Sequence, residues 1–556
     1  MAGGAHKELC SGERAVVLLF VFRVALSVPS SLFLHGSALC LLSLAALFVE
    51  ISVESSNVSL QRFKTRPGAS SGILLGASTL PSVMLSRLIQ ISRVLSIHEN
   101  GAEAELAYLE MQYWTVSACC LGVLVFFLYL QATSRKNWGS PFSLFTREMS
   151  CTYLCVLLYM VTCYFCFKLK SDAGKMHCWF GSNIWYLISH GAATAVLIQH
   201  ILQKFPSCSS IGEALLVSAG MVLCFGDMLT HTLAKVHTVS FGFMLQVQGE
   251  LLGLLLVPMC FKLTVQIWGY CRNTSTPRKI EITTLFYTSI IVMLSFLMPA
   301  WMNFVHNFGV HPLLWVINFV FTSPLERLAL CSYWICIIGI SVFRFYNISK
   351  QSKTERILLR KYYHLVAVLL FVPALIFQPS FLDLAFGTAL MVFLLLEMIR
   401  VWEIWPLGKM VHQFMNAFTD HRDSDVLIVS HFSLLLGCAL PKWMSSGFND
   451  RPLAPFAGIL SLGIGDTMAS MVGHKYGVLR WSKAGKKTVE GTAAGITSVW
   501  VACYILLPLL ASSGYILSQH WGSLLIAVTL SGLLEAYTAQ LDNAFIPLVF
   551  YSLLCL

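Results

Sequence analysis

The feature that most constrains this chain is a succession of apolar runs that continues almost from end to end. Each run, at about 20 residues, is long enough to cross a membrane as an α-helix. Hydrophobic residues make up 56% of the chain and charged residues 12%, whereas about 25% charged residues is typical of soluble domains. The sequence therefore predicts an all-α fold, a polytopic transmembrane helical bundle of about 15 spans, within a range of about 13 to 17.

The positive charge of the chain follows its loops. The formal net charge is +10, and Lys and Arg collect in the cytosolic loops of membrane proteins, where they fix the orientation. We prefer this explanation of the positive charge to the alternative that the chain binds nucleic acid. The basic loop 347–361 separates an N-terminal transmembrane helical region, residues 1–346, from a C-terminal region, residues 347–556, where we expect the chemistry.

The polar loops of the C-terminal region are separated by pairs of predicted spans, which places them all on one face of the membrane. If the loop 347–361 is cytosolic, successive pairs of spans return the chain to the cytosol at 399–424, 474–490 and 537–543. We therefore expect a site formed by loops that meet at the cytosolic surface.

One stretch, from Gly463 to Thr492, combines glycines, lysines and acidic residues in a pattern that suits a nucleotide phosphate. Glycine lets the backbone approach an anion, a helix N-terminus near Thr488 offers amides, and lysine supplies positive charge. Asp466, near the end of a span, is costly unless paired, and a divalent metal is a natural partner. The predicted nucleotide-binding residues are Gly463, Gly465, Gly473, Gly477, Arg480, Trp481, Lys483, Lys486, Lys487, Thr488, Glu490 and Gly491.

Each of these residues also has an ordinary structural explanation. Gly473 and Gly477 form a GxxxG pattern, which is common where helices pack. Lysines at a helix end can fix topology, and Thr488 and Glu490 can cap a helix. Taken together, the pattern favours phosphate binding, although it is not a P-loop, because no GxxxxGK[ST] motif follows a strand.

Other ionisable side chains lie in or beside neighbouring predicted spans. His364 and His431 fall inside spans, Asp423 precedes one, and Glu535 and Asp542 flank the last connection between spans. An ionisable residue in a span is a candidate functional residue. An interhelical hydrogen bond is the alternative for the histidines, and a solvated loop is the alternative for Asp423.

These motifs resemble the dolichol kinase family, a group of CTP-dependent polyprenol kinases, over residues 355–556. The resemblance implies that residues 463–491 bind CTP and that its γ-phosphoryl group moves to dolichol. CDP and the dolichyl phosphate used in glycosylation result, at the cytosolic face of the endoplasmic reticulum membrane. The residues that carry the resemblance are Arg360-Lys361-Tyr362-Tyr363-His364, Asp423-Ser424, His431, Gly465-Asp466-Thr467, Lys486-Lys487-Thr488, Glu490-Gly491-Thr492, Leu534-Glu535-Ala536-Tyr537-Thr538, Gln540 and Asp542-Asn543.

Phosphoryl transfer requires mainly positioning and charge neutralisation, which assigns hypothetical roles to these residues. Lys483, Lys486 and Lys487 bind the phosphates, carboxylates hold Mg²⁺ or another divalent cation, and a histidine or Asp423 positions or deprotonates the dolichol hydroxyl. The predicted catalytic residues are Asp466, Lys487, His364, His431 and Asp423, and the predicted metal ligands are Asp466, Asp542 and Glu535.

Other classes of function remain open on the sequence. A related enzyme would pair CTP with phytol or diacylglycerol, or would transfer a cytidylyl group to a lipid phosphate. A transporter would place ionisable residues at mid-span, whereas here they cluster at span ends. A non-catalytic scaffold would not bind CTP. The expected partners are dolichol and CTP, without nucleic acid, and the sequence indicates no protein partner.

Overall fold

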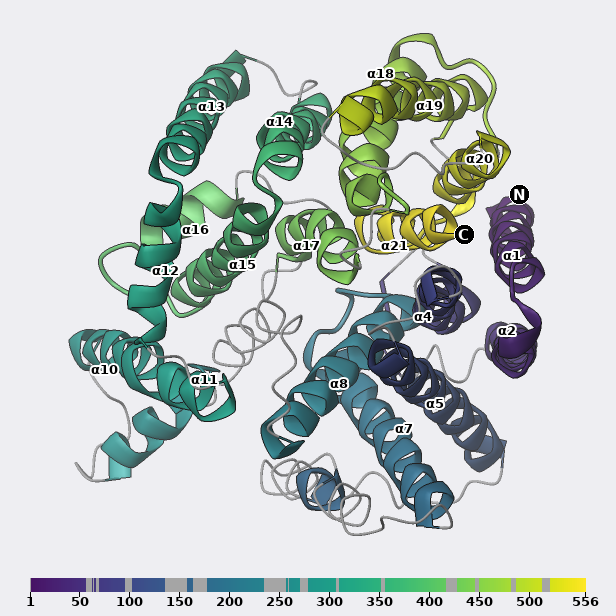
Figure 1. Cartoon of the computed structure of the whole chain (residues 1–556), viewed down its shortest axis with the longest axis horizontal. Helices are drawn as coiled ribbons and strands as arrows, with labels where there is room; N and C mark the ends of the chain where they lie inside the picture. Colours follow the sequence, from purple (N-terminus) through teal and green to yellow (C-terminus); the bar gives the residue numbers. More distant parts are fainter. Residues whose placement is uncertain are drawn as a thin grey trace. The chain divides into compact units, whose positions relative to one another are not determined.

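The described residues fold into a set of helices (Figure 1). A computed structural model describes residues 2–56, 63, 65–66, 70–95, 103–135, 158–163, 178–234, 257–258, 260–270, 279–306, 310–351, 356–416, 428–445, 450–481, 487–512 and 521–556. The helices of the first half are α1 (Ala2–Leu26), η1 (Ser30–Leu32), α2 (Phe33–Ser56), α4 (Ile73–Leu95), α5 (Glu103–Arg135), α7 (Cys178–Lys204), α8 (Ile211–Ala234), α10 (Lys279–Val292), η3 (Met293–Leu297) and α11 (Met298–His306). Those of the second half are α12 (Pro312–Thr322), α13 (Pro324–Gln351), α14 (Arg356–Phe377), α15 (Pro379–Val401), α16 (Gly408–Asn416), α17 (Val429–Met444), η4 (Ala454–Phe456), η5 (Ile459–Asp466), α18 (Thr467–Tyr476), α19 (Val489–Ser512), α20 (Trp521–Tyr537) and α21 (Asp542–Cys555).

The predicted all-α, polytopic class is confirmed. The described residues form helices without a β-strand, and eight of the helical segments are long and apolar enough to cross a membrane. Four shorter apolar helices, within α14, α17, α20 and α21, accompany them. Long stretches such as 136–157 and 235–256 lie outside the described residues, so the count of about 15 spans stays a prediction.

Contacts between helices divide the chain into two compact units. Unit 1 comprises Met1–Leu223, Gly339–Ile376 and Leu436–Leu556, and unit 2 comprises Cys224–Ile338 and Phe377–Leu435. All the predicted site residues except Asp423 and His431 belong to unit 1. The predicted functional division of the chain at residue 346 stays a prediction.

The centre of unit 1 is α21, which is buried on every side from Phe545 to its end. A helix that is apolar all round needs neighbours on every face, and α1, α4, α20 and η5 pack against it (Figure 1). Small side chains allow α4 to approach closely, and the Ser86 and Ser552 hydroxyls are hydrogen-bonded at 2.7 Å.

The turn between α20 and α21, residues 538–541, is held by side chains from the N-terminal part of unit 1. The Glu213 carboxylate accepts a hydrogen bond from the Leu541 amide at 2.7 Å and pairs with Arg66 at 2.7 Å. Arg66 also donates to the Ala539 carbonyl oxygen at 2.8 Å. Since Arg66 and Glu213 are only 6% and 2% exposed, each needs the other's charge.

The side chain of Gln540 completes this contact. Its amide donates to the Ser70 hydroxyl at 2.7 Å, and its oxygen accepts from the Ser210 hydroxyl. Ser210 also forms a capping box with Glu213 at the start of α8, with amide-to-side-chain bonds of 2.9 and 3.1 Å. Gly72 adopts φ +65°, and a Cβ there would lie 2.6 Å from the Gln540 amide group. We call Arg66, Ser70, Ser210, Glu213 and Gln540 the turn clamp.

Unit 2 has its own apolar core around aromatic side chains. The Phe261 and Phe286 rings pack edge to face at 5.4 Å, and Trp402 lies 4.6 Å from Phe261. A buried ion pair, Glu397 with Arg400 at 2.7 Å, borders this core. The remaining core residues are Ile399, Ile404, Val411 and Ile428.

Arg66→Ala should strongly destabilise unit 1, because it leaves the Glu213 carboxylate buried without its cation. Breaking a buried pair from one side costs about 3–5 kcal/mol. Thermal unfolding in detergent micelles would measure the loss, with Lys204→Ala at the exposed end of α7 as the control. Equal melting temperatures for the two variants would contradict a structural role for the pair.

Candidate active site

The candidate site lies where the ends of several unit 1 helices meet. Lys361 and His364 stand one turn apart on α14, so they share a helix face. Asp466 is the last residue of η5, a π-helical segment, and such segments are rare and frequent at functional sites. Glu535 lies near the end of α20, and Asp542 begins α21.

The centre of the site is an ion pair between Lys361 and Asp466. The ammonium group lies 2.6 and 2.5 Å from the two carboxylate oxygens. Asp466 is only 3% exposed. Because desolvating a lone carboxylate is very costly, the Lys361 charge permits Asp466 to be buried here.

His364 is oriented by the same carboxylate. Its Nδ1 lies 3.2 Å from Asp466 Oδ2 and 3.1 Å from the Leu462 carbonyl oxygen. Both neighbours are acceptors, so neutral His364 carries its proton on Nδ1 and leaves Nε2 as a proton acceptor. A carboxylate that fixes the tautomer of a histidine is the usual arrangement for a general base.

A second lysine, Lys487, connects the ends of α20 and α21. Its ammonium group donates to the Glu535 main-chain carbonyl and lies 3.5 Å from Asp542 Oδ2. A cation at the C-terminal end of a helix and an acid at an N-terminal end both match the helix dipoles. The charges of Asp466, Lys487, Asp542 and Lys361 all act on the Glu535 carboxyl, so the five groups form one electrostatic cluster. We call these five residues the charge cluster.

The basic loop is anchored as a short hairpin. Arg480 pairs with Thr488 in an isolated β-bridge. On either side of it, the Val489 amide donates to the Leu479 carbonyl oxygen at 2.8 Å, and the Trp481 amide donates to the Lys487 carbonyl oxygen at 3.3 Å. Lys483 and Lys486 fall between its arms, outside the described residues.

The first amides of α19 are largely used within the chain. Thr488 caps the helix by accepting from the Gly491 amide at 3.2 Å, and the Glu490 carboxylate accepts from the Leu479 amide at 2.9 Å. The Trp481 indole donates to the Thr492 hydroxyl at 2.9 Å. Since these groups have partners, the lysines are better placed than the helix amides to bind phosphate.

The predicted glycines allow close packing of helices. A Cβ on Gly491 would lie 3.0 Å from the Gly473 Cα, between α18 and α19, and one on Gly477 would lie 2.6 Å from the Thr488 side chain. A Cβ on Gly463 would lie 3.3 Å from the His364 carbonyl oxygen, and one on Gly465 would lie 3.0 Å from a methyl group of Val499. Their packing role is plain, and their predicted nucleotide role stays a prediction.

Among the three predicted metal ligands, Asp542 fits a cation best. Its Oδ1 is buried without a hydrogen-bond partner, whereas both oxygens of Asp466 are bonded to Lys361. No group of three His, Cys, Asp or Glu residues in the described ranges could hold a metal by itself. Mg²⁺ usually takes one or two carboxylates together with substrate phosphates, and the predicted metal role of Asp542 and Glu535 stays a prediction.

The side chains of two predicted catalytic residues lie outside the described part of the chain. His431 lies in α17, but its side chain is outside the described residues, and so is all of Asp423. Conversely, Lys361 was not among the predicted site residues. A signal was present, because a lysine one turn before a histidine at the entrance of an apolar span needs a buried acidic partner.

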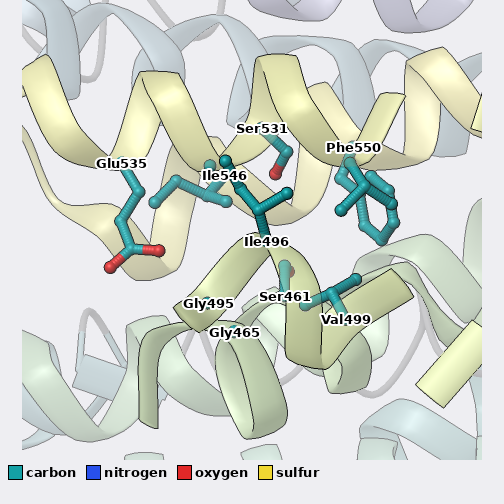
Figure 2. Close-up of a pocket in the computed structure, with 11 residues that line it drawn as sticks. Ser461, Gly465, Gly495, Ile496, Val499, Ser531, Glu535, Ile546 and Phe550 are labelled. Carbon is teal, nitrogen blue, oxygen red and sulfur yellow. The ribbon is translucent and has the colours of Figure 1, made fainter. Parts of the chain in front are cut away.

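A narrow pocket opens beside the charge cluster, between η5, α19, α20 and α21 (Figure 2). It encloses about 270 Å³ of empty space, including part that is open to the surroundings. Figure 2 shows Glu535 at one end and Phe550 at the other. We call it the slot, and its lining residues are Ser461, Gly465, Gly495, Ile496, Val499, Val528, Ser531, Gly532, Glu535, Ile546 and Phe550.

Fold and site together define a polytopic membrane protein with a partly buried charge cluster at its helix ends. The family model for dolichol kinase matches residues 195–440. "Dolichol kinase EVAN" of Arabidopsis thaliana is 58% identical over 98% of this chain and 98% of its own length. Dolichol kinase of Homo sapiens is 30% identical over 67% of this chain and 72% of its own, and that of Saccharomyces cerevisiae is 33% identical over 45% and 46%.

The chain belongs to the dolichol kinase family, as the sequence resemblance implied. The similarity to the Arabidopsis thaliana protein extends beyond residues 355–556 to nearly the whole chain. No solved structure matches the chain.

Removing either partner of the Lys361–Asp466 pair should destabilise unit 1 by about 3–5 kcal/mol, because the other charge stays buried. We expect Lys361→Met and Asp466→Asn each to lower the melting temperature in detergent, and the double variant to recover most of the loss. Additive losses in the double variant would show that the two charges are not coupled.

Proposed function

We propose that this chain transfers the γ-phosphoryl group of CTP to dolichol at the charge cluster. The observation that carries the proposal is that the charge cluster, with Asp466 buried at its centre, adjoins an apolar slot at Glu535. A phosphoryl transfer between a water-soluble donor and a lipid acceptor requires both environments side by side. Membership of the dolichol kinase family supports the same reaction.

The donor side is formed by the lysines of the hairpin. Lys487, together with Lys483 and Lys486, neutralises the CTP phosphates, since an ammonium group is a compact positive charge. Lys487 lies at the edge of the charge cluster, beside Asp542, so a phosphate held there would reach the carboxylates. Arg480 and Trp481 belong to the same hairpin and remain candidates for contacts with the nucleotide.

A divalent cation would bind at Asp542, with Glu535 as a second carboxylate. When bound, such an ion supplies charge neutralisation for the transferred phosphoryl group. Asp466 contributes indirectly, because its oxygens hold Lys361 and orient His364.

His364 is the best-oriented candidate for the general base. The dolichol oxygen attacks the γ-phosphorus, the bond from that phosphorus to the bridging β-oxygen breaks, and CDP leaves with the bond's electron pair. The hydroxyl proton passes to His364 Nε2, whose lone pair is free because Nδ1 carries the ring proton.

The cellular setting follows from the substrates and the charge pattern. Dolichol stays in the bilayer and CTP stays in water, so the reaction occurs at a membrane surface. Basic loops mark that surface as cytosolic, and we place the enzyme in the endoplasmic reticulum membrane, supplying dolichyl phosphate for glycosylation.

Membranes that contain the chain should transfer label from γ-labelled CTP to dolichol. Lys487→Ala should lower kcat/KM for CTP about 100-fold, in the range found when one charge-stabilising donor is removed. Lys204→Ala, which removes an exposed lysine of α7 outside residues 463–491, is the control and should leave the rate unchanged. Label transfer from ATP but not CTP would refute the donor, and full activity of Lys487→Ala would refute the site.

His364→Asn separates a base from a structural histidine. The asparagine amide can still donate to Leu462, in place of Nδ1, but it has no group at the position of Nε2. We expect kcat to fall about 100-fold or more while KM for CTP changes little. Near-normal kcat in this variant would assign His364 a structural role.

A further inference from the structure

The slot beside the charge cluster has an apolar wall and a charged end. Branched or aromatic side chains line its length, among them Val499, Val528 and Phe550. Glu535 lies at one end of the slot and Phe550 lies at the other (Figure 2). A pocket that grades from hydrocarbon to carboxylate suits an amphipathic ligand with one polar terminus.

Small residues set the width of the slot. Gly465, Gly495 and Gly532 come from three different helices, and Ser531 adds one more short side chain. A Cβ on Gly532 would run into the Ile496 side chain, and one on Gly495 would lie 3.0 Å from the Gly465 carbonyl oxygen. The helices are therefore as close as glycine permits, and the slot is narrow.

The lining excludes CTP as the occupant. A triphosphate needs cations and a base needs hydrogen-bond partners, whereas most of the slot is apolar. Even with the part that is open to the surroundings, its empty space of about 270 Å³ is below the range of about 300–1,000 Å³ usual for sites that hold a whole small ligand. The enclosed part is smaller still, so the slot can take at most the end of a longer molecule.

We propose that the slot binds the hydroxyl-bearing isoprenoid end of dolichol, with the hydroxyl at the Glu535 end. This inference rests on the proposed function, because it locates the acceptor of the same reaction. The rest of the lipid can stay in the bilayer, since α19 and α20 expose apolar side chains such as Val501, Leu525 and Ile526. Methyl branches of an isoprenoid fill a slot walled by valine and isoleucine better than a linear chain does.

The matched pair Val499→Phe and Val501→Phe tests this placement. Val499 is 6% exposed and lines the slot, whereas Val501, on the same helix, is 44% exposed and lies outside it. We expect Val499→Phe to lower kcat/KM for dolichol about tenfold or more with KM for CTP unchanged, and Val501→Phe to have no effect. An unchanged kcat/KM for dolichol in a folded Val499→Phe variant would overturn the slot.

Ser531→Val is a smaller change that keeps the proposal testable if Val499→Phe fails to fold. It adds bulk close to the proposed hydroxyl end. We expect the preference for a branched isoprenoid alcohol over a linear primary alcohol of equal carbon number to fall severalfold. An unchanged preference would overturn the slot. Absence of CTP-dependent activity in the unaltered chain would instead refute the proposed function.

Discussion

A lysine and an aspartate inside this protein depend on each other, because neither charge could remain buried alone. The Lys361–Asp466 pair joins α14 to the end of η5 and fixes the carboxylate that orients His364. Such pairs contribute little net stability and much to the specification of geometry in some proteins. The placement of the candidate base relative to Asp466 therefore depends on one interaction between segments 105 residues apart.

The sequence predicted the fold class, and it singled out several residues of the charge cluster, because both leave local signals. Apolar runs with few charges specify membrane helices directly. Asp466, Lys487 and Asp542 stood out as ionisable residues at span ends, and the structure brings the three into one charge cluster. For Thr488, which was predicted to bind the nucleotide, the structure shows the alternative capping role, since its hydroxyl accepts from the Gly491 amide.

The remainder could not be predicted because it depends on pairings between distant segments and on backbone irregularity. No local sequence pattern indicates that η5 is a π-helix. The wider turns of a π-helix change the direction in which its last residue, Asp466, points. The ion pair of Lys361 with Asp466 and the contact of Arg66 with the turn after α20 join residues 105 and 473 positions apart. The sequence pattern of the glycines fits phosphate binding and helix packing equally well. Their part in helix packing is visible only in the three-dimensional structure.

The turn clamp has a consequence for how the protein is made. Glu213 and Leu541 are separated by 328 residues, so the ribosome completes the Glu213 side of the contact long before the turn exists. The Arg66–Glu213 pair can form early, but its bonds to the main chain of the turn wait until residues 539–541 have been synthesised. Assembly of the candidate site thus comes long after synthesis of the N-terminal helices. A chain that stalls before α21 would leave the membrane with an N-terminal bundle whose receptor groups for the turn are empty, a natural target for quality control.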